Sequence, residues 1–223
     1  MSLEQPTELP RGKDVPDDDG VPLDSEWVAD QTRIYLIEPL RQYFGESGID
    51  AFVGGNSFVY YDPKEAPIGP DFYVVKGGVW RGQTRWVAWE ESHRLPTTVI
   101  EFLSPSTEGN DRGVKFCRYR DVFRTQEYFL VDQEALHIEG YSLAKGHYVA
   151  MTPDQAGWYR IPSLGMELGP VEGWIRLRTS DGKLLLTGRE RAEQEQRRAD
   201  RERQRADRLA RKLLELGIDP DSE

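Results

Sequence analysis

We predict a mixed α/β fold, in which one domain built on a mixed sheet is followed by an extended C-terminal helix, and three observations support it. Short apolar segments with strand composition alternate with two helical segments between about residues 24 and 186. Residues 189–216 contain no glycine and no proline, which favours an uninterrupted helix. The length of 223 residues suits one domain with extensions.

Composition limits the classes of protein to which this chain can belong. Charged residues make up 30% of it, and it has no run of about 18 apolar residues, so we expect no membrane-spanning helix. The first 20 residues lack the apolar centre of a signal peptide. Cys117 is the only cysteine, which excludes an internal disulfide and suits a reducing cytoplasm.

The charge is unevenly distributed. The net charge of −10 lies in the first 188 residues, which hold 19 basic and 29 acidic side chains, whereas residues 189–223 hold ten of each. Contacts with nucleic-acid phosphates need lysine and arginine. The composition therefore argues against avid, nonspecific binding of DNA by the main part of the chain.

We divide the chain into four parts. They are an irregular N-terminal arm (1–22), a domain (23–188), a charged helix (189–216) and a short tail (217–223). The arm is rich in Pro, Asp, Glu and Gly and has no apolar periodicity. We interpret its aspartate run, Asp17–Asp19, as solvated rather than as a metal site.

The domain is expected to begin with a helix. Asp24 or Ser25 can cap it, apolar side chains follow at helical spacing, and Gly45 and Gly48 can end it. Pro39 should break or kink this helix, because proline removes a backbone donor.

The next segments indicate strands. Residues 49–61 are expected to form a hairpin around Gly54-Gly55-Asn56. Residues 77–94 carry three tryptophans, which could stack nucleotide bases or close one edge of the core, and we favour packing. Further strands are expected at 127–131 and 158–161, as a pair at 137–143 and 148–151, and at 175–186 around an Asp181-Gly182 turn.

The most informative stretch is Thr97–Lys115. Glu101 interrupts a β-branched apolar strand, and a buried acid is costly unless it is paired or holds a metal. The strand should end at Pro105. A helix capped by Asn110 or Asp111 should then run to Phe123, with Cys117 expected as a small core residue.

A second acid has a similar setting. Asp71 follows Pro70 at the start of another apolar strand, and Lys115 lies on the helix after Glu101. Two carboxylates can hold a hard divalent cation such as Mg²⁺, and a nearby ammonium can hold a phosphate. Lys115 also fits a surface residue at the border of the core.

The C-terminal helix admits two interpretations. A heptad register places Ala192, Ala199, Ala206 and Leu213 at one seam position and Glu195, Glu202, Leu209 and Leu216 at the other. The seam is apolar only in its last two heptads, so a dimeric coiled coil and a single solvated helix remain open. Gly217 and Pro220 should end the helix.

Several ordered blocks resemble the Uma2 family. They are Pro70-Asp71, residues 99–106, Lys115 with Tyr119, and residues 127–132, within a resemblance that runs from about Asp24 to Leu168. The family implies the restriction-endonuclease-like fold of the PD-(D/E)XK superfamily. It also implies a DNA endonuclease that depends on Mg²⁺ or Mn²⁺.

The resemblance assigns roles to particular residues. Asp71, Glu101 and the carbonyl of Phe102 would bind the metal, and Lys115 would orient water or offset charge on the scissile phosphate. The motif lysine should stand at position 103, where this chain has Leu103. In folds of this class an N-terminal helix often adds an acid, here Glu26 or Glu38, and Tyr119 or Gln126 could support the ligands.

Two other hypotheses remain. The domain could be a catalytically inactive nuclease-like fold that serves as a binding or oligomerisation module, which Leu103 and the acidic composition favour. The chain could also be a scaffold whose working part is the C-terminal helix.

Overall fold

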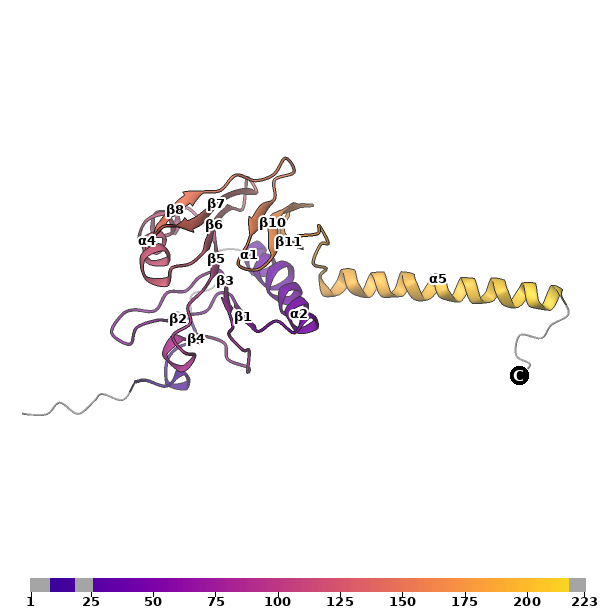
Figure 1. Cartoon of the computed structure of the whole chain (residues 1–223), viewed down its shortest axis with the longest axis horizontal. Helices are drawn as coiled ribbons and strands as arrows, with labels where there is room; N and C mark the ends of the chain where they lie inside the picture. The colour runs from indigo at the N-terminus through magenta and orange to yellow at the C-terminus, as the bar shows by residue number, and fades with distance from the viewer. Residues whose placement is uncertain (1–8, 19–25, 217–223) are drawn as a thin grey trace, which may run out of the picture. The chain divides into compact units, whose positions relative to one another are not determined.

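The computed structural model describes residues 9–18 and 26–216, and the chain divides into two compact units, Met1–Leu185 and Leu186–Glu223. The first unit has the predicted mixed α/β fold, built on a six-stranded sheet of order β1-β3-β5-β6-β7-β8 (Figure 1). Its strands are β1 (Ala51–Gly54), β3 (Phe72–Lys76), β5 (Thr98–Leu103), β6 (Glu127–Asp132), β7 (His137–Ala144) and β8 (His147–Ala150). Strands β5 and β6 are parallel, and the other neighbours are antiparallel.

The N-terminal helix covers one face of this sheet. It consists of α1 (Glu26–Asp30), a π-helical stretch (Gln31–Ile37) and α2 (Glu38–Ser47), and it ends at Gly48 in the left-handed conformation. Pro39 does not break this helix, which was one of the two effects expected of it. The preceding turns are instead widened, so that the amide of Glu38 bonds to the carbonyl of Arg33. The predicted caps Asp24 and Ser25 lie outside the described residues.

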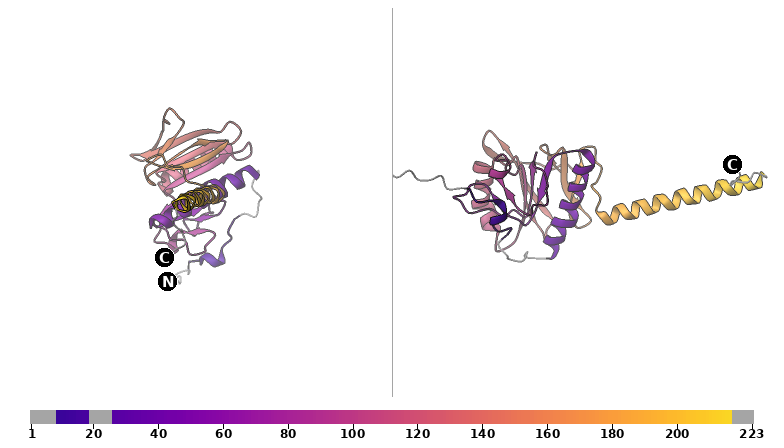
Figure 2. Two further views of the ribbon diagram at one scale, coloured as in Figure 1. Left: turned by 90° about the vertical axis from the view of Figure 1, so that its right-hand side faces the viewer. Right: turned by 90° about the horizontal axis from the view of Figure 1, so that it is seen from below.

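The second helix, Glu108–Phe123, covers the other face of the sheet. It comprises α3 (Glu108–Asn110), a π-helical turn (Asp111–Lys115), α4 (Phe116–Arg118) and a second π-helical turn (Tyr119–Phe123). It starts earlier than the predicted cap, because the amides of Thr107 and Glu108 both bond to the carbonyl of Ser104. Asp111 therefore lies inside the helix. Figure 2 shows the two helices on opposite sides of the sheet.

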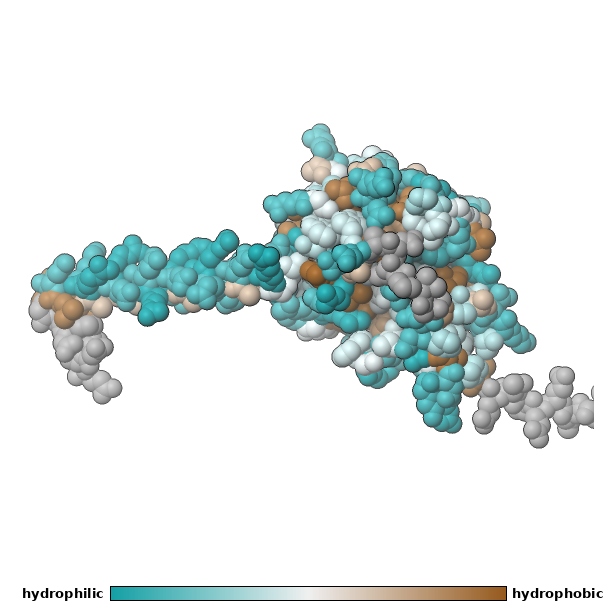
Figure 3. Space-filling model, turned by 180° about the vertical axis from the view of Figure 1, so that it is seen from behind, coloured by the Kyte–Doolittle hydropathy of each residue, from teal (hydrophilic) through white to brown (hydrophobic). Residues whose placement is uncertain are grey.

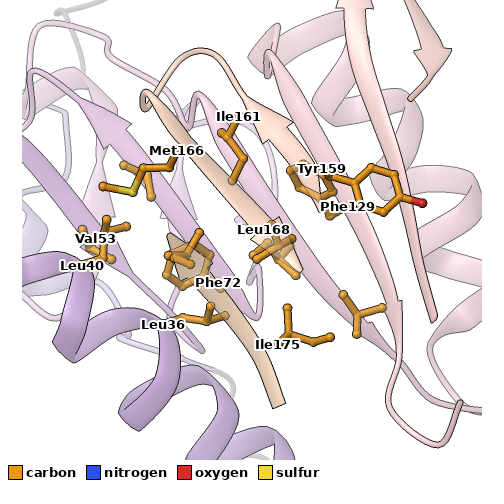
Figure 4. Packing of buried hydrophobic residues seen from close by; sticks show 14 of the residues in the cluster. Leu36, Leu40, Val53, Phe72, Phe129, Tyr159, Ile161, Met166, Leu168 and Ile175 are labelled. Carbon is orange, nitrogen blue, oxygen red and sulfur yellow. The ribbon is translucent and has the colours of Figure 1, made fainter. Parts of the chain in front are cut away.

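Alternating strand residues supply two apolar cores. The larger core joins the N-terminal helix, the six-stranded sheet and a three-stranded sheet, β9 (Tyr159–Ile161), β10 (Met166–Val171) and β11 (Trp174–Thr179). Figure 4 shows Leu36 and Leu40 of the helix, Val53 and Phe72 of the large sheet, and Leu168 of the small one within this core. The smaller core lies under the Glu108–Phe123 helix.

The predicted hairpin at 49–61 is wrong. β1 pairs with β3, Val53 lying opposite Val74, because both faces of β1 are buried and it needs partners in the interior of the fold. Residues after the turn form β2 (Val59–Tyr60), which pairs in parallel with β4 (Trp86–Val87). The turn residue Asn56 donates its amide to the carbonyls of Pro70 and Asp71.

Other predictions had mixed outcomes. The β7–β8 hairpin is confirmed, whereas the β10–β11 hairpin was not predicted. The chain turns back at Asp181-Gly182 as expected: Arg178 and Leu184 form an antiparallel bridge across the turn, and the amide of Leu185 bonds to the carbonyl of Leu177. The packing interpretation of the tryptophans holds for buried Trp86, but Trp80 is 55% exposed.

Two surface features also differ from expectation. Asp17 is not simply solvated, because it forms an ion pair of 2.7 Å with Arg85 and its carbonyl accepts the amide of Phe58. Cys117 is exposed rather than in the core, since it lies on the outer side of its helix.

The second unit contains one long helix, α5 (Gly188–Glu215). A capping box starts it, in which Thr187 and Glu190 satisfy each other's backbone amides. None of its residues is buried, and Figure 3 shows a hydrophilic surface along most of its length, with apolar atoms near its C-terminal end. Among the residues that the structure describes, no helix is long and apolar enough to cross a membrane.

Candidate active site

Asp71 and Glu101 meet on the face of the sheet that the Glu108–Phe123 helix covers. β3 and β5 are antiparallel, and Phe72 lies opposite Ile100. Continuing this register by one residue places Asp71 opposite Glu101. The backbone amide of Asp71 donates to Glu101 Oε2 at 3.2 Å, and the amide of Phe102 donates to Asp71 Oδ2 at 2.7 Å. The two carboxylates are therefore fixed side by side by the strands themselves.

Lys115 reaches these carboxylates from the helix. Its Nζ lies 3.0 Å from Glu101 Oε2 and 3.0 Å from Asp111 Oδ1, and it donates to the carbonyl of Gly69 at 3.3 Å. Glu101 is fully buried, Asp111 is 1% exposed and Lys115 is 17% exposed. The ammonium is thus held between a strand and its own helix.

Two tyrosines complete the cluster. The Tyr119 hydroxyl donates to Glu101 Oε1 at 2.6 Å, and the Tyr128 hydroxyl donates to the backbone carbonyl of Asp111 at 3.0 Å. Both side chains are fully buried in the smaller core. Each Glu101 oxygen therefore has a fixed donor, which sets the orientation of the carboxylate.

Burial shifts the pKa values of these groups. Burial and the carboxylates of Asp71 and Asp111 raise the pKa of Glu101 to about 8, although the ammonium of Lys115 and the hydroxyl of Tyr119 oppose the shift. Burial also raises the pKa of Asp71, against the opposing effect of Lys115. Burial alone would lower the pKa of Lys115, but the carboxylates around it outweigh that effect and raise the pKa.

Comparison with known proteins places the chain in a family. The family profile of Uma2, described as "Putative restriction endonuclease", matches residues 18–172. The chain belongs to the Uma2 family. Among solved structures, the crystal structure of a putative nuclease belonging to DUF820 from Anabaena variabilis shares 14% sequence identity, with a TM-score of 0.46, over 64% of this chain and 75% of that chain. No curated protein matches the chain.

The Uma2 region contains all the residues of the cluster, and the structure brings most of the predicted site residues together. Asp71, Glu101, the backbone of Phe102 and Lys115 are in direct contact. Glu26 is not part of this group: it is exposed at the first position of α1, and no hydrogen bond or ion pair among the described residues joins it to the cluster. Glu38 faces Arg33 at 3.6 Å.

Two features of the Uma2 site were not predicted. Asp111, expected only as a cap, is the second carboxylate on Lys115, and the i,i+4 spacing of the two residues on one helix was a usable signal. The carbonyl of Gly69, which also accepts from Lys115, had no signal in the sequence. Gln126 is exposed, and Leu103 packs at the edge of the smaller core.

The donor chemistry of the cluster suits a hard divalent cation. Asp71, Glu101 and Asp111 face the single ammonium of Lys115, which leaves two uncompensated negative charges when all four groups are ionised. Among the described residues there is no group of three or more His, Cys, Asp or Glu side chains that could hold a metal ion. Mg²⁺ does not need one, because it usually takes one or two carboxylates and completes its shell with water and substrate phosphate.

Proposed function

We propose that this Uma2 protein is a divalent-metal-dependent DNA endonuclease of the PD-(D/E)XK type, which hydrolyses phosphodiester bonds at Asp71, Glu101 and Lys115. One observation carries the proposal: Lys115 Nζ lies 3.0 Å from Glu101, although it comes from the following helix. An ammonium thus stands beside the two carboxylates even though the motif position is occupied by Leu103.

The proposed cofactor is Mg²⁺ or Mn²⁺, held by Asp71, Glu101 and the carbonyl of Phe102. The amide and the carbonyl of one strand residue point to the same side, and the Phe102 amide already points at Asp71. When bound, such a cation would polarise the scissile phosphate and lower the pKa of the attacking water. The net negative charge of the buried cluster favours its binding.

The side chains of the protein have separate tasks in this proposal. Lys115 is placed to orient the attacking water or to offset the charge that develops on the phosphate. The Phe102 amide and the Tyr119 hydroxyl hold Asp71 and Glu101 in fixed orientations. Glu26 would act only as an additional acid near the substrate.

Cleavage of supercoiled plasmid and of single-stranded DNA in the presence of Mg²⁺ or Mn²⁺ tests the function. We expect the wild-type protein to cut, EDTA to stop it, and Asp71→Ala to be inactive, because one metal ligand is removed. Glu65→Ala, an exposed acid on the same domain, is the matched control and should retain activity.

Two results of the cleavage assay would contradict the proposed function. If neither metal supports cleavage of either substrate, or if Asp71→Ala cuts as fast as the wild type, the nuclease proposal is wrong. The inactive, nuclease-like binding module then becomes the better explanation.

We also propose that the protein works in a reducing cytoplasm and that it forms a homodimer. Leu209 and Leu216, which share one seam position, are exposed near the end of α5, and pairing of two such helices would cover them. Sedimentation at micromolar concentration, compared between the wild type and Leu209→Gln, would show whether the helix pairs. The same helix would be the working part if the protein were instead a scaffold.

A further inference from the structure

The C-terminal helix gathers six of its basic side chains on one side. With about 3.6 residues per turn, positions 197, 198, 201, 205, 208 and 212 fall within an arc of about 100°. All six are basic, and we call them the basic face of α5: Arg197, Arg198, Arg201, Arg205, Arg208 and Lys212. The acids of the same stretch, Asp200, Glu202 and Asp207, lie outside this arc.

Much of the basic face is left without acidic partners. Arg197 lies 3.6 Å from Glu193 and Arg198 lies 3.2 Å from Glu202. Among the described residues Arg201, Arg205 and Lys212 form no ion pair, and all three are exposed. Their charges are therefore available to a ligand.

A helix that needed only solubility would not have this arrangement. Cations three or four residues apart on one face repel one another and destabilise an isolated helix, whereas alternating signs would stabilise it. Such repulsion is relieved when a polyanion lies along the face. A run of five basic positions, 197, 201, 205, 208 and 212, spans about 22 Å at 1.5 Å per residue, a length that carries about 13 phosphate charges in duplex DNA.

We propose that the basic face of α5 binds the phosphate backbone of duplex DNA without reading its sequence. The inference rests on the proposed nuclease function, because it supplies the DNA contact that the acidic domain lacks. The first 188 residues carry the whole net charge of −10. A DNA substrate would be repelled by the domain and attracted by the helix.

Pairing of two helices would cover only one edge of this face. The alanines of the heptad seam, Ala192, Ala199 and Ala206, lie on the side of the helix roughly opposite to it, at 3.6 residues per turn. The other seam position, which includes Leu209 and Leu216, adjoins the edge of the basic face at Arg198 and Arg205. A coiled coil that uses this seam would therefore leave Arg197, Arg201 and Arg208 in solvent.

Fluorescence anisotropy with a labelled 20-base-pair duplex, measured in EDTA over a series of KCl concentrations, tests the proposal on the full chain. EDTA prevents cleavage, so binding is measured independently of catalysis. The test variant carries Arg201→Gln, Arg205→Gln and Lys212→Gln. The control carries Arg189→Gln, Arg203→Gln and Arg211→Gln, which removes the same charge from other sides of the same helix.

The slope of log K against log[KCl] is the readout, because each phosphate contact contributes about 0.9 to it. We expect the test variant to reduce the slope by about 2 to 3 and the control by less than about 1. Equal reductions in both variants, no reduction in the test variant, or no salt-dependent binding by the wild type would overturn the inference. A change of oligomeric state in the test variant alone would also overturn it, because the face would then be an interface between copies.

Failure of the two proposals can be distinguished. A protein that binds DNA through this face and does not cut it with any metal supports the inference while contradicting the nuclease. If the wild type cuts DNA but the test variant keeps the wild-type salt slope, the nuclease proposal is supported and the inference about the basic face is contradicted.

Discussion

Lys115→Met is expected to lower the rate of DNA cleavage about 10²- to 10³-fold at saturating metal, as removal of one preorganised charge beside a reacting group does in other enzymes. The ammonium of Lys115 is 3.0 Å from Glu101, and the backbone carbonyl of Gly69 also fixes it. The variant keeps Asp71 and Glu101, so metal binding should persist while catalysis is lost.

Two controls make this result interpretable. Lys64→Met removes an exposed lysine and should leave the rate unchanged. Removal of Lys115 also leaves Asp111 buried without its partner, which destabilises a fold. Asp111→Asn added to Lys115→Met relieves that penalty, and the double variant should melt closer to the wild type and remain slow. Wild-type rates in Lys115→Met or in the double variant would show that Lys115 has no part in catalysis.

Glu101→Gln is expected to change how stability depends on pH in the metal-free protein. The pKa of Glu101 is about 8 in the folded chain because the group is buried, and about 4.3 in an unfolded chain. Between these values the folded state holds a proton that the unfolded state has released. The contribution of Glu101 to the free energy of unfolding should therefore be greatest below about pH 4.3 and fall as pH rises towards 8, by on the order of a few kcal/mol.

Urea unfolding at pH 5 and pH 8 with EDTA measures this effect. The loss of stability between the two pH values should be clearly smaller in Glu101→Gln than in the wild type, since glutamine does not ionise. The exposed Glu65→Gln is the control and should keep the wild-type difference. An identical loss in all three proteins would mean that Glu101 is ionised throughout, held by Lys115 and Tyr119.

The parts of the fold that depend on one strand or one helix could be predicted from sequence. The buried strand around Glu101 and the helix that returns Lys115 follow from apolar periodicity and from the breaker Pro105. The pairing of β1 with β3 could not be predicted, because two short apolar segments near Gly54-Gly55 fit a hairpin equally well. Strand partners depend on tertiary packing, which local composition does not specify.

In the candidate site, too, the sequence could predict some residues and not others. Asp71, Glu101 and Lys115 could be proposed because isolated charged residues in apolar surroundings are conspicuous. The sequence predicts Asp111 as a helix cap, but the helix begins three residues earlier, at Glu108. Asp111 therefore lies within the helix, one turn before Lys115, and pairs with it. The charges of residues 189–223 cancel in the sequence, and only helical geometry shows that six of the cations of α5 share one side.

The central claim is that the Asp71–Glu101 pair binds a divalent cation, and thermal melting with Mn²⁺ at pH 8 tests it most directly. At a concentration about 100 times its Kd, Mn²⁺ should stabilise the wild type by about 2.7 kcal/mol. For a chain of this size that corresponds to a rise in Tm of about 5–10 °C. Asp71→Asn and Glu101→Gln should lose this rise, and Glu65→Gln should keep it. A wild-type Tm that does not respond to millimolar Mn²⁺, or a full rise in both site variants, would contradict the account.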